Sequence, residues 1–241
     1  ALDRGAAGFI AKPFKAAELH QKVGRAIDRL VLTEVELRER LLAPTVASVL
    51  ANAIEVRDSS MEGHTERLAA LALEIGRRER LSDPDLEALE LGAVLHDVGK
   101  IGISDSILMK PGPLTAEERA AVERHPEIGD QMLAPLALLE PVRPIVRHHH
   151  ERWDGSGYPD GLAGKDIPLL ARIVAVADSI EAMSSSRPYR SPLGEGDVVR
   201  ELEHGRGRQW DPRLVDIAVE LVASGQLRFG PSGMSLLTER P

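Results

Sequence analysis

Three consecutive histidines, His148, His149 and His150, open the turn-rich stretch HHHERWDGSGYPDGL, which spans residues 148–162. Histidine is scarce here, with 8 among 241 residues. Solvated surface side chains are one explanation for such a run. The other is chemistry, because neutral imidazoles bind divalent transition-metal ions and exchange protons near neutral pH. The surroundings of the remaining histidines decide between the two.

Other histidines and aspartates lie on the apolar stripes of predicted helices. His64 is aligned with Leu68 and Leu71 at helical spacing, and Asp178 lies within a stretch, 171–183, that is apolar nearly all round. The pattern does not fix the orientation of His125, which stands at the end of its predicted helix. The residues expected to point inward are His64, His96, Asp97, His149, His150 and Asp178.

A single inward histidine is most simply a core side chain satisfied by a backbone carbonyl. Two inward carboxylates change that interpretation, since a buried carboxylate costs several kcal/mol unless it is paired or binds a metal. The inward positions of the helices around Asp97 and Asp178 supply imidazoles and not arginines. With no cysteine in the chain, a metal must be held by His, Asp or Glu. The set favours divalent first-row ions.

The segment HDVGK, residues 96–100, concentrates this chemistry. Neighbouring helical residues differ by about 100° in direction, so His96 and Asp97 can reach one centre. The two carboxylate oxygens of Asp97 can bridge two ions, and a two-metal site activates water and clamps a phosphoryl oxygen. We expect Gly99 to end the helix and Lys100 to turn back toward phosphate.

Apolar residues recur at three- and four-residue spacing almost throughout, which predicts an all-α fold. We expect one helix to begin with Asp83 as N-cap and Pro84 in its first turn. Thr115 and Glu118 predict a capping box, and Pro126 is expected to close the following helix soon after His125. Residues 171–183 predict a central buried helix.

Composition excludes several classes of protein. The net charge is −8 and no long basic stripe is visible, which argues against a nucleic-acid polymer as partner. No apolar run is long enough to span a membrane, and no signal peptide is present. We expect a soluble, cytoplasmic protein. Because the chain begins at Ala1 with a segment that looks cut, we also expect a fragment of a longer protein.

The motifs HDVGKIGISDSILMKPGPLT and HHERWDGSGYPDGLAGKDIPLLARI resemble the HD-GYP domain, a branch of the HD phosphohydrolases. The resemblance covers about residues 46–222 and includes RPYR and DPRLV in the expected order. It implies an HD-type helical bundle with a metal centre and hydrolysis of the bacterial second messenger cyclic di-GMP. The predicted HD-GYP domain is 44–241.

The resemblance also implies roles for single residues. Because Glu151 sets the register of the His-His-Glu motif, His148 is the spare histidine. One ion would take His64, His96, Asp97 and Asp178. The second would take Asp97, His125, His149 and His150, and Fe and Mn suit these ligands best. The implied catalytic residues are His96, Asp97 and Lys100, and the implied nucleotide-binding residues are Lys100, Gly157, Tyr158, Pro159, Arg187 and Arg190.

Two positions depart from the family pattern. Some members carry a glutamate four residues before the first histidine, which helps to hold a third metal, and here that position is Ser60. We therefore expect two ions and not three. Glu181 stands where aspartate is commoner, and we expect it to support a ligand without binding metal itself.

The N-terminal segment GAAGFIAKPF, residues 5–14, followed by a charged helix, resembles the end of a response-regulator receiver domain. Lys12-Pro13 matches its Lys-Pro pair. The predicted receiver fragment is 1–32, with a strand near 8–11, and a helical linker covers 33–43. We expect this long helix to pair two copies of the chain as a homodimer.

Three hypotheses for function follow. The first is a phosphodiesterase that cuts cyclic di-GMP to pGpG, GMP or both, as the output of a two-component response regulator. The alternative is a slow or inactive HD-GYP domain that senses the nucleotide and binds a protein partner through its GYP surface. A general nucleotide phosphohydrolase is the third, and the GYP loop argues against it.

Overall fold

The computed structural model describes residues 42, 44–50, 63–185, 191–230 and 233–237. The chain divides into two units, Ala1–Thr45 and Val46–Pro241. The predicted receiver fragment, almost all of the linker, Ser60, Arg187 and Arg190 lie outside the described residues. Among those described, no helix has both the length and the apolar composition needed to span a bilayer.

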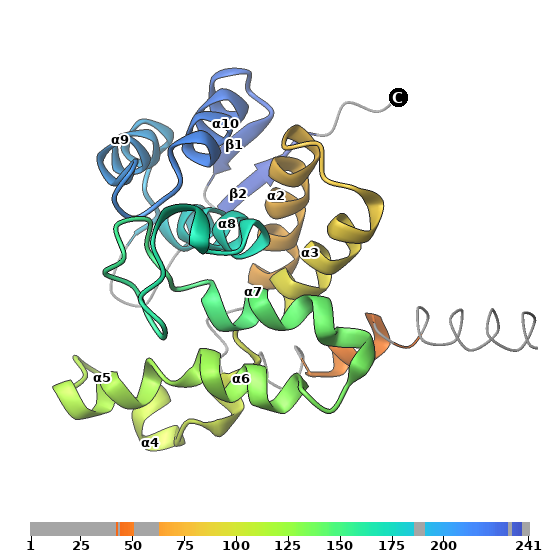
Figure 1. The fold of residues 1–241 in the computed structure, drawn as a ribbon. Helices are drawn as coiled ribbons and strands as arrows, with labels where there is room; N and C mark the ends of the chain where they lie inside the picture. The colour runs from red at the N-terminus through yellow and green to blue at the C-terminus, as the bar shows by residue number, and fades with distance from the viewer. Residues whose placement is uncertain (1–41, 43, 51–62, 186–190, 231–232, 238–241) are drawn as a thin grey trace, which may run out of the picture. The chain divides into compact units, whose positions relative to one another are not determined.

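The second unit is mainly helical, as the spacing predicted (Figure 1). Its helices are α2 (His64–Arg78), α3 (Asp83–Leu95), α4 (Asp105–Leu108), α5 (Ala116–Val122), α6 (His125–Leu133), α7 (Arg143–His148), α8 (Leu169–Ser184), α9 (Glu195–Gly205) and α10 (Pro212–Ala223). Within the described residues they are connected by the 3-10 helices η3 (Val98–Gly102), η4 (Ala137–Val142) and η5 (Gly164–Asp166). Two strands, β1 (Leu227–Gly230) and β2 (Gly233–Leu236), complete the order.

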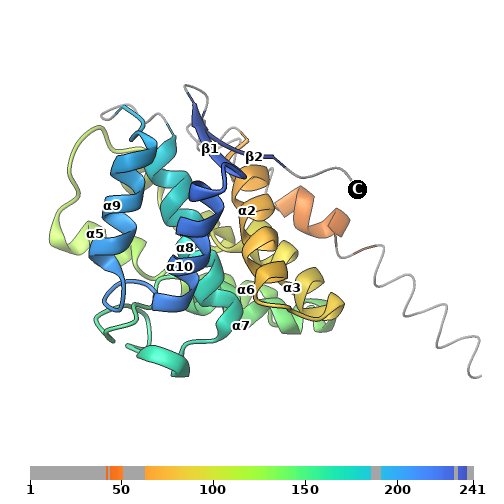
Figure 2. The ribbon, with the colours of Figure 1, turned by 90° about the horizontal axis from the view of Figure 1, so that it is seen from above.

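Helix α8 is the centre of this unit and confirms the predicted buried helix. It packs against α2, α3, α7, α9 and α10. Figure 2 shows α8 and α10 between α9 on one side and α2 and α3 on the other. The α8 side chains with no exposed surface are Ala171, Ile173, Val174, Val176, Ala177 and Ile180. Apolar burial on all sides fixes the axial position and rotation of α8, and with them the direction of Asp178.

The turn that carries the HD pair differs from the prediction. Helix α3 ends at Leu95, with His96 as C-cap, and the chain tightens into η3 directly after Asp97. Gly99 therefore does not end α3, and its backbone lacks the positive φ of a C-cap glycine. Its role is close approach: a Cβ on Gly99 would lie 1.9 Å from the carbonyl oxygen of His125. This contact seats η3 on α6.

The prediction that Pro126 closes a helix was wrong, because this proline stands at the start of the next helix. Helix α5 ends at Val122, and Pro126 stands in the first turn of α6, of which His125 is the first residue. Proline suits that place, because the N–H groups of a first turn have no helical acceptor to lose. His125 thus stands at the start of α6, beside η3.

Of the other predicted helix ends, one is confirmed and one shifts by a residue. The capping box of Thr115 and Glu118 opens α5 as expected. The N-cap of α3 is Ser82, whose Oγ accepts a hydrogen bond from the backbone N–H of Asp85, so Asp83 is the first helical residue. Serine and aspartate cap about equally well, and neighbouring candidates cannot be separated by type alone.

The antiparallel hairpin of β1 and β2 is an addition to the predicted all-α fold. Leu227 pairs with Leu236 and Phe229 with Met234. Leu227 and Met234 are buried in the core, where β1 contacts α10 and β2 contacts α2 and α8. Strands of four residues are too short for alternation to distinguish them from a turn of helix.

We predict that Gly99→Ala will destabilise the protein, because the added Cβ must push η3 away from α6. Overpacking against backbone should lower the free energy of unfolding by at least about 2 kcal/mol, or the melting temperature by roughly 5 °C. The matched control is Gly196→Ala in α9, where the nearest atom would lie 3.9 Å from the new Cβ. Differential scanning calorimetry measures both variants, and a Gly99→Ala protein as stable as the control would contradict the close packing of η3 and α6.

Candidate metal centre

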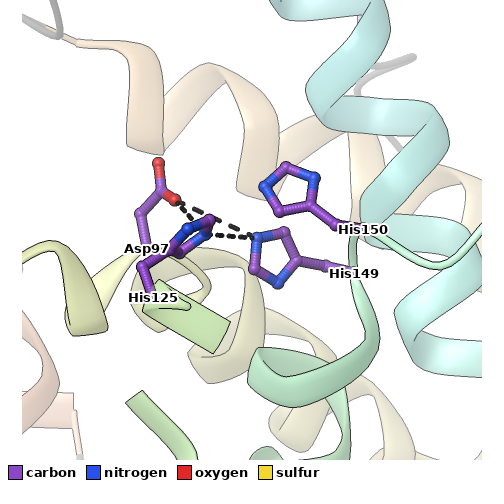
Figure 3. Close-up of side chains that lie close together, drawn as sticks. All are labelled: Asp97, His125, His149 and His150. Carbon is purple, nitrogen blue, oxygen red and sulfur yellow. Dashed lines mark hydrogen bonds and ion pairs between the residues drawn. The ribbon is translucent and has the colours of Figure 1, made fainter. Parts of the chain in front are cut away.

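The structure brings all seven predicted ligands together in two groups of potential metal-binding atoms. The first, here called the Asp97 group, contains Asp97, His125, His149 and His150; the second, the His64 group, contains His64, His96 and Asp178. Within each group the nearest ligand atoms all lie within 4.8 Å of one another. Figure 3 shows the Asp97 group, with its carboxylate facing the imidazoles of His125 and His149.

Asp97 is placed to connect the two groups. Its Oδ1 lies 3.1 Å from Nε2 of His125 and 3.9 Å from Nε2 of His149. Its other oxygen, Oδ2, lies 3.3 Å from Nε2 of His96, which belongs to the His64 group. The two oxygens thus face different histidines, as a bridging carboxylate requires.

Three of the histidines use their second ring nitrogen in the same way. Nδ1 of His96, His125 and His149 each lies 2.8 Å from the backbone carbonyl three residues earlier, of Ala93, Val122 and Val146. A carbonyl only accepts, so Nδ1 carries the proton and Nε2 is left to face the centre. The backbone satisfaction expected of a core histidine is therefore present, and it fixes the tautomer that metal binding needs.

Burial and charge set the protonation of these groups. Burial holds the pKa of His149 well below its usual range and lowers that of His150 to about 4, so both are neutral near pH 7. Burial also disfavours the charged form of His96, but the carboxylate of Asp97 outweighs it and raises the pKa to about 9. The burial of Asp97 is likewise outweighed by Lys100 and His96, which hold its pKa well below the usual range.

Lys100 lies at the edge of the centre, as expected. Its Nζ donates to Oδ2 of Asp97 at 2.5 Å, and its side chain is 21% exposed. The tight turn of η3 makes this contact within three residues, with the N–H of Lys100 donating to the carbonyl of Asp97 at 2.9 Å. The ammonium therefore offsets one oxygen of the carboxylate while remaining accessible to solvent.

The GYP loop packs directly against the Asp97 group. The Tyr158 ring lies 4.9 Å from that of His150, tilted by 35°, and the Tyr158 N–H donates to the carbonyl of His150. Gly157 permits this fold, since a Cβ there would lie 2.3 Å from the backbone nitrogen of Arg152. One face of Tyr158 is therefore occupied by a predicted ligand. The predicted roles of Gly157, Tyr158 and Pro159 in nucleotide binding stay predictions.

Glu151 and Arg147, to which sequence reasoning gave no supporting role, hold that loop. The buried carboxylate of Glu151 accepts the backbone N–H groups of Asp160 and Leu162 at 2.8 and 3.1 Å. Arg147 donates through two nitrogens to Asp160, each at 2.8 Å. These partners are 9, 11 and 13 residues apart in the chain. Asp160 and Leu162 lie in the loop beyond α7, so helical periodicity could not have revealed them.

His148 lies apart from both groups. Its Nδ1 is 3.8 Å from Glu151 and 3.5 Å from Asp160. With these two carboxylates it forms a third set of potential ligands. However, the oxygens of Glu151 already bind loop N–H groups and those of Asp160 bind Arg147, so this set belongs to the support of the GYP loop.

The comparison with known families agrees with this geometry. Residues 48–214 match the model of the family described as HD domain. The chain belongs to the HD domain family. Together with its relatives, this match supports an HD phosphohydrolase of the HD-GYP type. The receiver domain predicted ahead of it stays a prediction.

Several curated relatives are phosphodiesterases by name. One is the cyclic di-GMP phosphodiesterase response regulator RpfG of Xanthomonas campestris, 39% identical over 233 residues, covering 90% of this chain and 62% of that protein. Another is a cyclic di-GMP phosphodiesterase of Thermotoga maritima, 36% identical, covering 91% and 66%. A third is 3'3'-cGAMP-specific phosphodiesterase 2 of Vibrio cholerae, 37% identical, covering 77% and 36%. The chain thus spans between about one third and two thirds of these relatives' length.

Two solved structures have the same fold. A cyclic GMP-AMP specific phosphodiesterase of V. cholerae, V-cGAP3, is 20% identical with a TM-score of 0.55, over 74% of this chain and 48% of that one. Bd1817, an HDG"Y"P protein of Bdellovibrio bacteriovorus, is 18% identical with a TM-score of 0.55, over 76% and 62%. Both contain the helical arrangement described above.

We predict that His148→Ala will retain metal, whereas His149→Ala and His150→Ala will each lose it. Nδ1 of His148 faces the GYP loop, while the other two imidazoles belong to the Asp97 group. Metal content measured by inductively coupled plasma spectrometry after loading with Mn²⁺ and desalting distinguishes them. An equal loss in all three variants would contradict the assignment.

We also predict that metal binding near pH 7.5 will release about one proton per chain, because His96 must give up its Nε2 proton to act as a ligand. Its pKa of about 9 keeps it protonated below that pH, so the proton competes with the ion and metal affinity should rise as the pH approaches 9. Isothermal titration calorimetry in buffers of different ionisation enthalpy counts the released protons. Binding without proton release at pH 7.5 would show that His96 is already neutral or is not a ligand.

Proposed function

We propose that this chain is a metal-dependent phosphodiesterase that hydrolyses cyclic di-GMP to pGpG, GMP or both, and that it is the cytoplasmic output domain of a response regulator. The observation that carries the proposal is the pair of ligand groups joined by Asp97. The names of the X. campestris and T. maritima relatives support cyclic di-GMP as the substrate.

The donor set fits two divalent ions. Asp97 Oδ1 is buried and accepts no hydrogen bond within the described part of the chain, so a cation would compensate a carboxylate oxygen that protein groups leave unsatisfied. Imidazole and carboxylate donors without thiolates suit Fe and Mn. We propose that His64, His96, Asp97 and Asp178 hold one ion and that Asp97, His125, His149 and His150 hold the other. Two such ions would activate a water molecule and withdraw electrons from the phosphodiester.

The remaining residues would bind and orient the substrate. Lys100, partly exposed beside Asp97, would bind a non-bridging phosphate oxygen with its ammonium group. Tyr158, whose ring already packs on His150, would present its free edge and hydroxyl to the nucleotide. We propose Arg187 and Arg190 as further contacts for phosphate or guanine. Both of these groups can accept two parallel hydrogen bonds from a guanidinium.

Two alternatives have specific support. The V. cholerae relatives named 3'3'-cGAMP-specific phosphodiesterases make 3'3'-cGAMP a second candidate substrate. An inactive sensor that binds the nucleotide and a protein partner is the other alternative. The presence of all seven predicted ligands favours hydrolysis over sensing, because a degenerate sensor has no need to keep the complete set.

We predict that Asp97→Asn will lower turnover of cyclic di-GMP by at least about 100-fold, equivalent to about 3 kcal/mol of barrier, because the neutral amide cannot share charge between two ions. Its metal content should fall as well. The matched control is Asp166→Asn, on the exposed side of η5, which should be as active as the wild type.

The measurement is product formation by liquid chromatography from cyclic di-GMP, 3'3'-cGAMP and GTP, each supplied separately with Mn²⁺. Preference for cyclic di-GMP supports the proposal. Preference for 3'3'-cGAMP would make that nucleotide the substrate in place of cyclic di-GMP. Binding of cyclic di-GMP without turnover supports the sensor. Full activity of Asp97→Asn would contradict the shared-carboxylate centre.

A further inference from the structure

Glu181 is a buried carboxylate on α8 that belongs to neither ligand group. It lies three residues after Asp178 on the same helix, and its side chain is 1% exposed. One of its oxygens, Oε2, contacts Nδ1 of His64 in a short hydrogen bond. The other, Oε1, accepts from Nε and Nη2 of Arg67 at 3.0 and 2.6 Å and from Oγ of Ser185 at 2.6 Å.

The acceptor for Nδ1 of His64 differs in type from that of three other predicted ligands. The Nδ1 atoms of His96, His125 and His149 find a backbone carbonyl three residues earlier. His64 is the first residue of α2 and follows Gly63, which has a left-handed φ of 66°. For His64 the acceptor is the carboxylate of Glu181, from the neighbouring helix α8.

The carboxylate differs from a carbonyl in charge. The guanidinium of Arg67, which donates two hydrogen bonds to Oε1, favours the charged form of this carboxylate. This charged acceptor binds Nδ1 of His64 and leaves Nε2 facing Asp178, 3.6 Å from its Oδ1. It also makes the imidazole a stronger electron donor than one bonded to a neutral carbonyl.

A merely structural role is a poor explanation for this arrangement. Helices α2 and α8 already pack through Leu68, Leu71 and Ile180, all fully buried. Burying Glu181 with a partly buried Arg67 costs desolvation that a well-packed hydrophobic pair would avoid. Arg67 and Ser185 hold Oε1 of Glu181 in place, and Oε2 contacts His64.

We propose that Glu181, fixed by Arg67 and Ser185, is the positioning residue of His64, and that it strengthens metal binding at the His64 group selectively. Glu181 sets the tautomer and the direction of His64, whereas His96, His125 and His149 bond neutral backbone carbonyls. The proposal rests on the ligand role given to His64 in the proposed function.

The test uses Glu181→Gln, which keeps the shape of the side chain and removes its charge. In the metal-free protein, long-range ¹⁵N–¹H correlation spectra report the tautomer of each imidazole, with His64 assigned by comparison with His64→Gln. The wild type should show His64 protonated on Nδ1, and Glu181→Gln should show a mixture. This arm requires no bound ion.

The second arm is titration with Mn²⁺, followed by electron paramagnetic resonance of the free ion. The wild type should bind two ions. In Glu181→Gln one dissociation constant should rise by about 10- to 100-fold while the other stays within about twofold. Arg67→Met should shift the same constant in the same direction by a smaller factor, and it serves as the second variant if Glu181→Gln does not fold.

The matched control is Asp211→Asn, which neutralises another buried carboxylate, paired with Arg172 and remote in sequence from every predicted ligand. It should lose thermal stability and keep both Mn²⁺ affinities. The proposal is overturned if Glu181→Gln keeps its His64 tautomer and both affinities, or if Asp211→Asn loses the same ion. A wild-type protein that binds no Mn²⁺ while His64 shows the expected tautomer change would refute the metal centre instead.

Discussion

The arrangement of the candidate metal centre depends on one buried carboxylate, that of Asp97. Asp97 has a side chain only 10% exposed, and an ionised carboxylate in that position must be compensated by opposite charge or by hydrogen bonds. Lys100 and His96 compensate Oδ2. Oδ1 faces His125 and His149 and accepts no hydrogen bond from the residues that the structure describes. The position of Asp97 Oδ1 therefore indicates where a cation would bind. The surrounding imidazoles favour a divalent transition-metal ion.

Four of the seven proposed ligands lie at helix ends. His64 begins α2, His96 caps the C-terminus of α3, His125 begins α6 and His149 caps the C-terminus of α7. At an end the backbone can turn, so an imidazole can reach past its own helix toward a common point. The helix bodies pack around α8, and the close contact of Gly99 with α6 fixes the remaining separation.

The sequence could predict those features that depend on local spacing. Examples are the buried helix α8, the capping box at Thr115 and the inward direction of His64. It could not predict features in which the partner is distant in sequence: Glu181 meets His64 across 117 residues, and no periodic pattern links them. The sequence also could not decide which of two neighbouring residues, Ser82 or Asp83, caps α3, because both are good N-caps. Nor could it predict a strand as short as β1.

The proposed ligands and the residues that support them differ in how far the sequence could predict them. The types of the proposed ligands followed from chemistry, since buried carboxylates among imidazoles, in a chain without cysteine, have few roles other than metal binding. The supports followed only in part: Glu181 was expected to support a ligand, but its partner His64 was not predicted. Glu151 and Arg147 resemble ordinary surface charges in sequence and become informative only through burial and contacts. Motifs alone therefore name the candidate ligands but leave out most of the contacts that orient them.

The most direct test of the central claim is the anomalous scattering of crystals grown with Mn²⁺, measured with X-rays on the high-energy side of the manganese absorption edge. The account predicts two anomalous peaks per chain, about 3.5–4 Å apart, with the carboxylate of Asp97 between them and the His64 and Asp97 groups on opposite sides. A single peak, or two peaks that do not share Asp97, would contradict it.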